Sequence, residues 1–153
     1  MDVIPPFSFV LVLEDGESLT WVDSRKLEEL GLDDPFGVAI QNLRTRTVHP
    51  LRRQSITDGS GAWFVGENDG LDSGRLLLLD MWASVKADLP GELLVRVATR
   101  GIVLCCSKVA ADMGLVDAVV ADVARDARAQ GSEPVESPWL AWLPNGWATI
   151  ELA

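Results

Sequence analysis

The feature that most restricts the possible folds of this chain is an abrupt change from a polar turn to an apolar segment. The turn at 68–75 reads Asn-Asp-Gly-Leu-Asp-Ser-Gly-Arg and runs directly into the apolar segment 76–82. Asn, Asp and Gly favour tight turns, and Asp or Ser commonly caps the start of a helix. The pattern predicts a central helix from this turn to about Leu89, with Arg75 held at its start. This pattern indicates how the chain folds but does not indicate any chemical activity.

Four apolar side chains of the predicted central helix are spaced three and four residues apart. They are Leu78, Met81, Trp82 and Val85. Residues at this spacing share one face of an α-helix, so we expect all four in the main core.

The charge balance limits the classes of partner. With 13 basic and 23 acidic residues among 153, the chain has a net charge of −10, which would repel a nucleic-acid backbone. No segment has the ~20 consecutive apolar residues that span a bilayer, and residues 1–6 lack the basic start of a secretion signal. We therefore expect a cytoplasmic protein with no nucleic-acid partner and no membrane contact.

Short β-branched or apolar segments joined by tight turns predict several β-hairpins. Because single strands and helices do not alternate regularly, we expect one α+β domain over 1–153, with a largely antiparallel sheet of hairpins packed against three main helices. The predicted strands are 7–13, 18–22, one near 55, 62–65, 92–98, 102–107, 139–143 and 147–152, and the predicted helices are 24–30, 35–46, the central helix and 111–130.

No combination of residues indicates a catalytic centre, a metal site or a cofactor. The sole histidine, His49, has no serine or cysteine nucleophile with a supporting acid beside it. Glu67, Asp69 and Asp72 lack the spacing and the closing glutamate of a calcium loop, so we interpret them as turn and helix-start carboxylates. We therefore predict no catalytic residue, no metal ligand and no cofactor.

Arg75 and Arg100 are the candidate anion-binding residues. A positive charge near a helix start opposes the helix dipole, so Arg75 needs another partner. One alternative is a small-anion pocket formed by both arginines. The other, which we favour, is an internal pair of Arg75 with Asp72 or Asp69.

A second cluster of basic residues lies between positions 44 and 53. It would form an anion-binding patch if its side chains converged in space. The favoured alternative is internal pairing with the surplus of acids. The four residues are Arg44, Arg46, Arg52 and Arg53.

Three of the six tryptophans lie within nine residues near the C-terminus. In a strand, Trp139 and Trp142 point to opposite faces of the sheet. Each face is either buried by another element or left as an apolar surface, and tryptophan is enriched at interface hot spots. Core filling is the favoured interpretation, and a partner-binding surface at Trp139 and Trp142 is the alternative.

Four short motifs carry a resemblance to known proteins: Leu30-Gly31-Leu32 through Ala39, Asn42-Leu43-Arg44, Asp69-Gly70 through Leu78, and Val97-Ala98-Thr99-Arg100. In combination, over roughly residues 27–150, they resemble the YtpQ-like family of bacterial proteins. The resemblance implies a cytoplasmic bacterial protein with a single α+β fold, and it transfers no catalytic residue because the family has no assigned activity. One departure is Gly101, where family members tend to carry an acid after the hairpin arginine.

These observations favour a non-catalytic protein that acts through protein contacts. It would be a homodimer or an accessory protein, such as a toxin-neutralising immunity protein whose acidity suits a basic target. The alternative is a small-anion-binding protein or an enzyme with a pocket near Arg75 and Arg100. A binding module should expose an aromatic or acidic patch, whereas an enzyme should have a concave pocket with converging polar groups.

Overall fold

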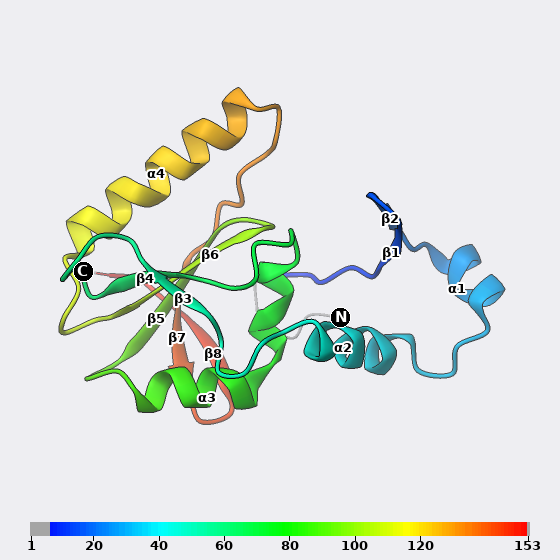
Figure 1. Cartoon of the computed structure of the whole chain (residues 1–153), viewed down its shortest axis with the longest axis horizontal. Coiled ribbons are helices and arrows are strands. Elements are labelled where there is room, and N and C mark those ends of the chain that lie inside the picture. Colours follow the sequence, from blue (N-terminus) through cyan, green and yellow to red (C-terminus); the bar gives the residue numbers. More distant parts are fainter. Residues whose placement is uncertain (1–6, 153) are drawn as a thin grey trace.

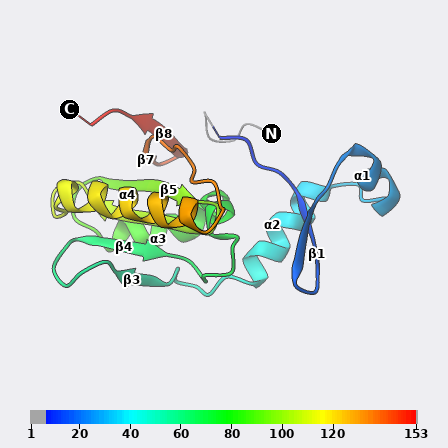
Figure 2. The same ribbon diagram turned by 90° about the horizontal axis from the view of Figure 1, so that it is seen from above.

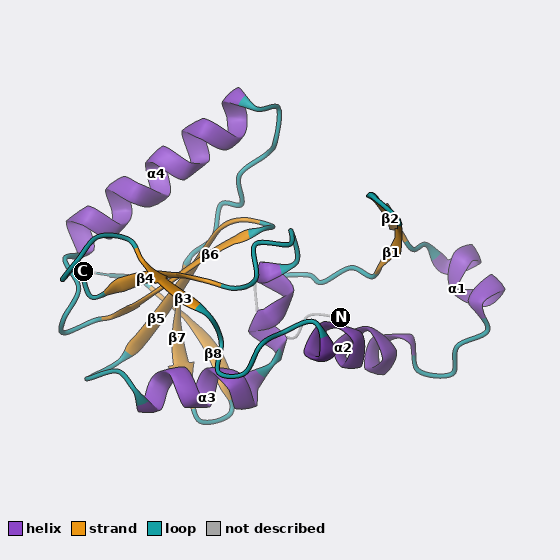
Figure 3. Cartoon of the chain, viewed as in Figure 1, coloured by secondary structure: helices purple, strands orange, loops and turns teal. Residues whose placement is uncertain are grey.

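The computed structural model describes residues 7–152, and these form the predicted α+β fold (Figure 1). The main sheet is antiparallel throughout, with six strands in the order β3-β4-β6-β5-β7-β8, and β1 and β2 form a separate hairpin. The strands are β1 (Val12–Asp15), β2 (Ser18–Trp21), β3 (Arg53–Ser55), β4 (Ala62–Val65), β5 (Leu93–Thr99), β6 (Ile102–Ser107), β7 (Trp139–Leu143) and β8 (Gly146–Ile150). The helices are α1 (Ser24–Leu30), α2 (Pro35–Thr45), the 3₁₀ helix η1 (Asp72–Leu77), α3 (Leu79–Ala87) and α4 (Met113–Ala129), coloured purple in Figure 3.

Alternate side chains of the sheet face two different helices. On β5, Leu93 and Val95 belong to the core cluster that contains the buried residues of α3, whereas Leu94 packs with Val116 of α4. This period of two follows from the pleat of a strand, and it places one helix on each face of the sheet. Figure 1 shows α3 and α4 on opposite sides of the sheet.

The two predicted C-terminal hairpin strands are an integral part of the sheet. β7 pairs with β8 along its whole length, and it joins β5 through the pairs Leu94–Ala141 and Val95–Leu140. The β5–β6 hairpin also forms as predicted, with an irregularity between Val97 and Thr99. Tight-turn signals therefore located the hairpins correctly.

The prediction of one continuous central helix is wrong. The segment divides into η1 and α3 at Leu78, whose backbone dihedral angles of φ −86° and ψ 67° are not helical. Leu76 and Leu78 are exposed by only 1% and 0%. Residues two positions apart point roughly 200° away from each other on an α-helix, so a continuous helix could not bury both in the same core.

The burial prediction for the same segment is confirmed. Leu78, Met81, Trp82 and Val85 are all buried in the main core cluster. Trp82 also satisfies its polar group there, because its Nε1–H donates a hydrogen bond of 2.8 Å to the carbonyl oxygen of Arg75. This bond bridges the break between η1 and α3.

The N-terminal part of the chain stands away from the sheet. No residue from 7 to 46 is buried, although Ile40 and Leu43 of α2 pack partly against the main core. Figures 1 and 2 show β1, β2 and α1 projecting beyond the body of the molecule. We call residues 10–38 the N-terminal arm.

Replacing Leu78 tests the packing at the helix break. Leu78→Ala is expected to lower the free energy of unfolding by about 2–5 kcal/mol, because it removes a fully buried side chain and leaves a cavity. Leu79→Ala is the matched control: Leu79 is 37% exposed, so its loss should cost less than about 1 kcal/mol. Urea denaturation measures both, and equal effects of the two variants would contradict the packing.

Candidate functional site

The guanidinium of Arg75 lies at the centre of a buried polar cluster. Its Nη1 donates to Oδ1 of Asp69 at 2.7 Å and to Oδ1 of Asp72 at 2.6 Å, and its Nη2 donates to Oδ2 of Asp69 at 2.9 Å. Its Nε donates to Oγ1 of Thr47 at 2.9 Å, so all three nitrogens have partners. The side chain is only 1% exposed. The internal pairing of Arg75 with Asp69 and Asp72, which the sequence favoured, is confirmed.

The turn before η1 is folded around the Asp72 carboxylate. Both carboxylate oxygens accept backbone N–H groups, Oδ1 from Glu67 at 2.8 Å and Oδ2 from Asn68 at 3.1 Å. At Gly66, where φ is 133°, a Cβ atom would come within 2.0 Å of Oδ1 of Asp72. Glycine is therefore the residue that allows this turn to close on the acid.

The cluster joins elements that are far apart in the sequence. Thr47, directly after α2, accepts from Arg75 and donates its own hydroxyl to the carbonyl oxygen of Leu43 at 2.7 Å. Asp69 also lies 3.7 Å from Arg46, whose guanidinium pairs with Glu14 of β1. One arginine thus connects η1, the preceding turn and the end of α2.

The two carboxylates of the cluster differ in their pKa values. The hydrogen bond from Arg75 lowers the pKa of Asp69 below its usual value, and this carboxylate is still 20% exposed. Burial raises the pKa of Asp72, which is 4% exposed. The difference in burial accounts for the opposite directions, since desolvation penalises the ionised form.

Arg100 occupies a different position from Arg75. Its side chain is exposed and forms no ion pair with any residue between 7 and 152. Only its backbone reaches the polar turn, where the carbonyl oxygen accepts from the Ser73 N–H at 3.1 Å. A Cβ atom at Gly101 would lie 3.2 Å from Cα of Gly70, so the close approach of the two turns accounts for glycine at this position.

Removing Arg75 should destabilise the fold. Arg75→Ala leaves the buried Asp72 carboxylate without a counter-ion and Asp69 with only Arg46 at 3.7 Å, and we expect it to lower the free energy of unfolding by about 3–5 kcal/mol. Arg100→Ala, the control, removes an exposed and unpaired charge and should cost at most about 0.5 kcal/mol. If the two arginines instead form an anion pocket, phosphate would raise the melting temperature of the wild type in a saturable way, and Arg75→Ala would abolish that shift.

The lowered pKa of Asp69 makes its contribution dependent on pH. The folded state binds a proton at this site less readily than the unfolded state, so the stabilisation is present above about pH 4 and is lost as the pH falls through the folded-state pKa. The difference in unfolding free energy between the wild type and Asp69→Asn should therefore be largest near neutral pH and shrink below about pH 4. Urea denaturation at several pH values measures it, and a constant difference would contradict the assignment.

The second basic cluster is internally paired, as favoured. Each of its arginines has a carboxylate partner on another part of the chain, so none is available as an unpaired cation. The pairs are Arg44 with Asp80 at 2.6 Å, Arg46 with Glu14, Arg52 with Glu67 at 3.3 Å, and Arg53 with Asp88 at 2.7 Å.

The C-terminal tryptophans pack on opposite faces of the sheet. Trp139 is 7% exposed, and the Arg96 guanidinium lies 5.5 Å from its ring centre. Trp142 is half-buried and meets Trp147 edge to face at 5.1 Å, and Trp147 meets Trp82 in the same way. Core filling accounts for both side chains, while partner binding by Trp139 and Trp142 stays a prediction.

The arm carries an exposed surface that the sequence analysis did not single out. Eight of its residues are acidic and two are basic, a net charge of −6 out of the −10 of the whole chain. The segment 24–30 is short and has few apolar residues, so it could not cover a core. This pattern was the sequence signal that could have indicated an exposed arm. The large apolar side chains exposed on the arm are Val10 (54%), Leu13 (36%), Trp21 (67%), Leu30 (37%), Leu32 (42%) and Val38 (42%).

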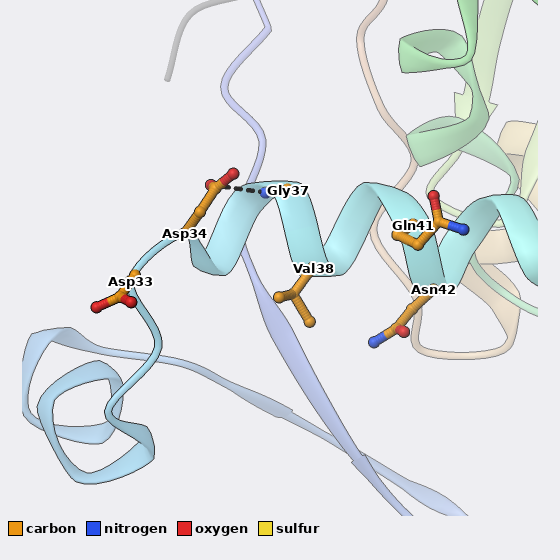
Figure 4. Close-up of a pocket in the computed structure, with 6 residues that line it drawn as sticks. All are labelled: Asp33, Asp34, Gly37, Val38, Gln41 and Asn42. Carbon is orange, nitrogen blue, oxygen red and sulfur yellow. Dashed lines mark hydrogen bonds between the residues drawn. The ribbon is translucent and has the colours of Figure 1, made fainter.

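A shallow hollow of about 540 Å³ lies on the first turns of α2 (Figure 4). Asp34 caps the helix by accepting from the Gly37 N–H at 2.9 Å. Val38 and Asn42 point to the same side of α2, as Figure 4 shows. The hollow thus places an apolar side chain beside the acidic start of the helix.

Comparison with known proteins finds one distant similarity that covers part of the chain. The chain is 29% identical over 91 residues to a UPF0354 protein of Listeria innocua, and the match covers 58% of this chain and 34% of the relative. The chain therefore spans about a third of the relative that it matches. No family model matches the chain, and no solved structure matches it. Among residues 7–152, no helix is long and apolar enough to cross a membrane.

Proposed function

We propose that this protein is a non-catalytic binding module whose N-terminal arm docks onto a basic surface of another protein. The observation that carries the proposal is that the arm is folded but contains no buried residue. The resemblance to the YtpQ-like family and the similarity to a UPF0354 protein are compatible with a cytoplasmic bacterial role of this kind.

The energetics of the arm support a binding role. A two-stranded hairpin or a helix of seven residues is marginally stable by itself in water, because neither buries enough apolar surface. Both are present here, as β1-β2 and α1, without a core of their own. A partner that covers Trp21 and the neighbouring apolar side chains would supply the missing burial.

The charge of the arm supports a basic partner. Opposite charges across an interface accelerate association and disfavour wrong partners, whereas like charges oppose association. Two copies joined through their arms would bring together two surfaces that each carry −6. A basic protein therefore fits better than a second copy, and a toxin-neutralising accessory protein is one role of this class.

The aromatic side chain most suited to anchor a partner is Trp21. It is 67% exposed at the end of β2, and tryptophan dominates binding energy at many interfaces. The alternative function, an anion site or enzyme at Arg75 and Arg100, has less support because the Arg75 guanidinium is already held by two carboxylates.

Site-specific photo-crosslinking in bacterial cells tests the proposal. A photoreactive residue at position 21 should capture a protein with a basic surface, and the same group at position 143, where Leu143 is 47% exposed at the end of β7 in the main sheet, should not. With the captured partner purified, Trp21→Ala should weaken binding at least about tenfold. Reversal of Asp15 and Glu17, two exposed acids of the arm, to lysine should slow association.

Three results would contradict this proposal. The first is equal capture at positions 21 and 143. The second is capture of a second copy of the chain at position 21, together with a dimer mass in light scattering, which would establish the homodimer instead. The third is an affinity for the captured partner that Trp21→Ala leaves unchanged.

A further inference from the structure

A cleft lies between α4 and the segment that leads into β7. Its volume is about 730 Å³, and it is widely open to solvent. The segment is fixed on one side by the Val135 N–H, which donates to the Ala98 carbonyl oxygen at 3.0 Å, and by Ser137 Oγ, which accepts from the Val97 N–H at 3.2 Å. The apolar part of the lining consists of Val120, Ala121, Ala124, Pro134, Val135 and Pro138.

The shape of the cleft follows from how α4 packs. Val116 and Val120, the two buried residues of α4, lie in its first half and hold that half against the sheet. Beyond them, the small side chains of Ala121 and Ala124 leave room between the helix and the facing prolines. Figure 1 shows α4 ending away from the sheet and the segment that follows it running back to the sheet.

Two arginines line the cleft, and within the described residues only one of them forms an ion pair. Arg96 is held by Asp117 at 2.9 Å and lies over the Trp139 ring. Arg128 is exposed and forms no ion pair with any residue of the described range 7–152, whereas ten of the thirteen basic side chains do. Arg128 thus places an unpaired guanidinium beside the apolar wall of the cleft.

We propose that this cleft binds a small ligand with an aliphatic body and one carboxylate. The carboxylate would pair with Arg128, because guanidinium and carboxylate match in charge and in planar hydrogen-bond geometry. The aliphatic body would lie along the valine, alanine and proline side chains. Asp117 and Glu136 also line the cleft, and their charges disfavour a doubly charged group such as a phosphate monoester.

This ligand site is independent of the arm. Figure 1 places α4 and the arm on opposite sides of the molecule, and the residues that line the cleft all lie between 96 and 138. Loss of partner binding by Trp21→Ala would therefore leave the cleft intact, so the two proposals can fail separately.

Titration of the full ¹⁵N-labelled chain with octanoate tests the site. We expect saturable chemical-shift changes confined to amides of 120–128 and 134–138. Arg128→Gln should raise the dissociation constant for octanoate at least about tenfold, because it removes a charge-assisted hydrogen bond. Octan-1-ol, which lacks the carboxylate, should bind the wild type and Arg128→Gln with equal affinity.

Two matched variants separate the cleft from the general surface of α4. Ala124→Trp fills the cleft and should abolish octanoate binding, while Ala118→Trp, on an exposed part of the same helix, should not. Arg125→Gln removes a neighbouring arginine that pairs with Asp122 outside the cleft, and it should leave the affinity unchanged. Two results would overturn the proposal: chemical-shift changes that are absent or spread over the whole chain, or an equal loss of octanoate affinity in Arg125→Gln and Arg128→Gln.

Discussion

The pairing of Arg75 with Asp69 and Asp72 is the interaction on which the connections of this fold depend. Its components come from η1, from the preceding turn and, through Thr47, from the end of α2. A charge buried to this degree is costly unless every hydrogen bond is made, and here each nitrogen of the guanidinium has an acceptor. The turn, the 3₁₀ helix and the direction of α2 are consequently mutually dependent, although each is short.

The molecule combines two regions of very different packing. The sheet and the elements packed against it hold the buried residues of the three core clusters, whereas the arm has none. The ion pair between Arg46 and Glu14 lies where these regions meet. The packed core thus lies in the sheet and its helices, and the arm carries exposed apolar and acidic side chains.

Local sequence patterns predicted most of the elements, and non-local packing explains the exceptions. Turn residues located the β5–β6 and β7–β8 hairpins because their backbone requirements act within a few positions. The break at Leu78 had no such signal, since 76–82 is apolar apart from Asp80 and suits a helix. It arises because Leu76 and Leu78 are drawn into the same core. The pairing of Arg75 could be expected from the nearby acids, but the contribution of Thr47, 28 positions away, could not.

The amino-acid order alone determined the α+β class, the hairpins, the buried face of 78–85 and the acidity, because propensity, periodicity and charge are local or additive properties. The tertiary structure decided which apolar residues remain uncovered. Trp139 and Trp21 are the same residue type in similar strand contexts, yet one is 7% and the other 67% exposed. Their difference depends on whether another element packs against the strand, and that depends on contacts between distant segments. For the same reason, the arm and the α4 cleft became visible only in the folded chain.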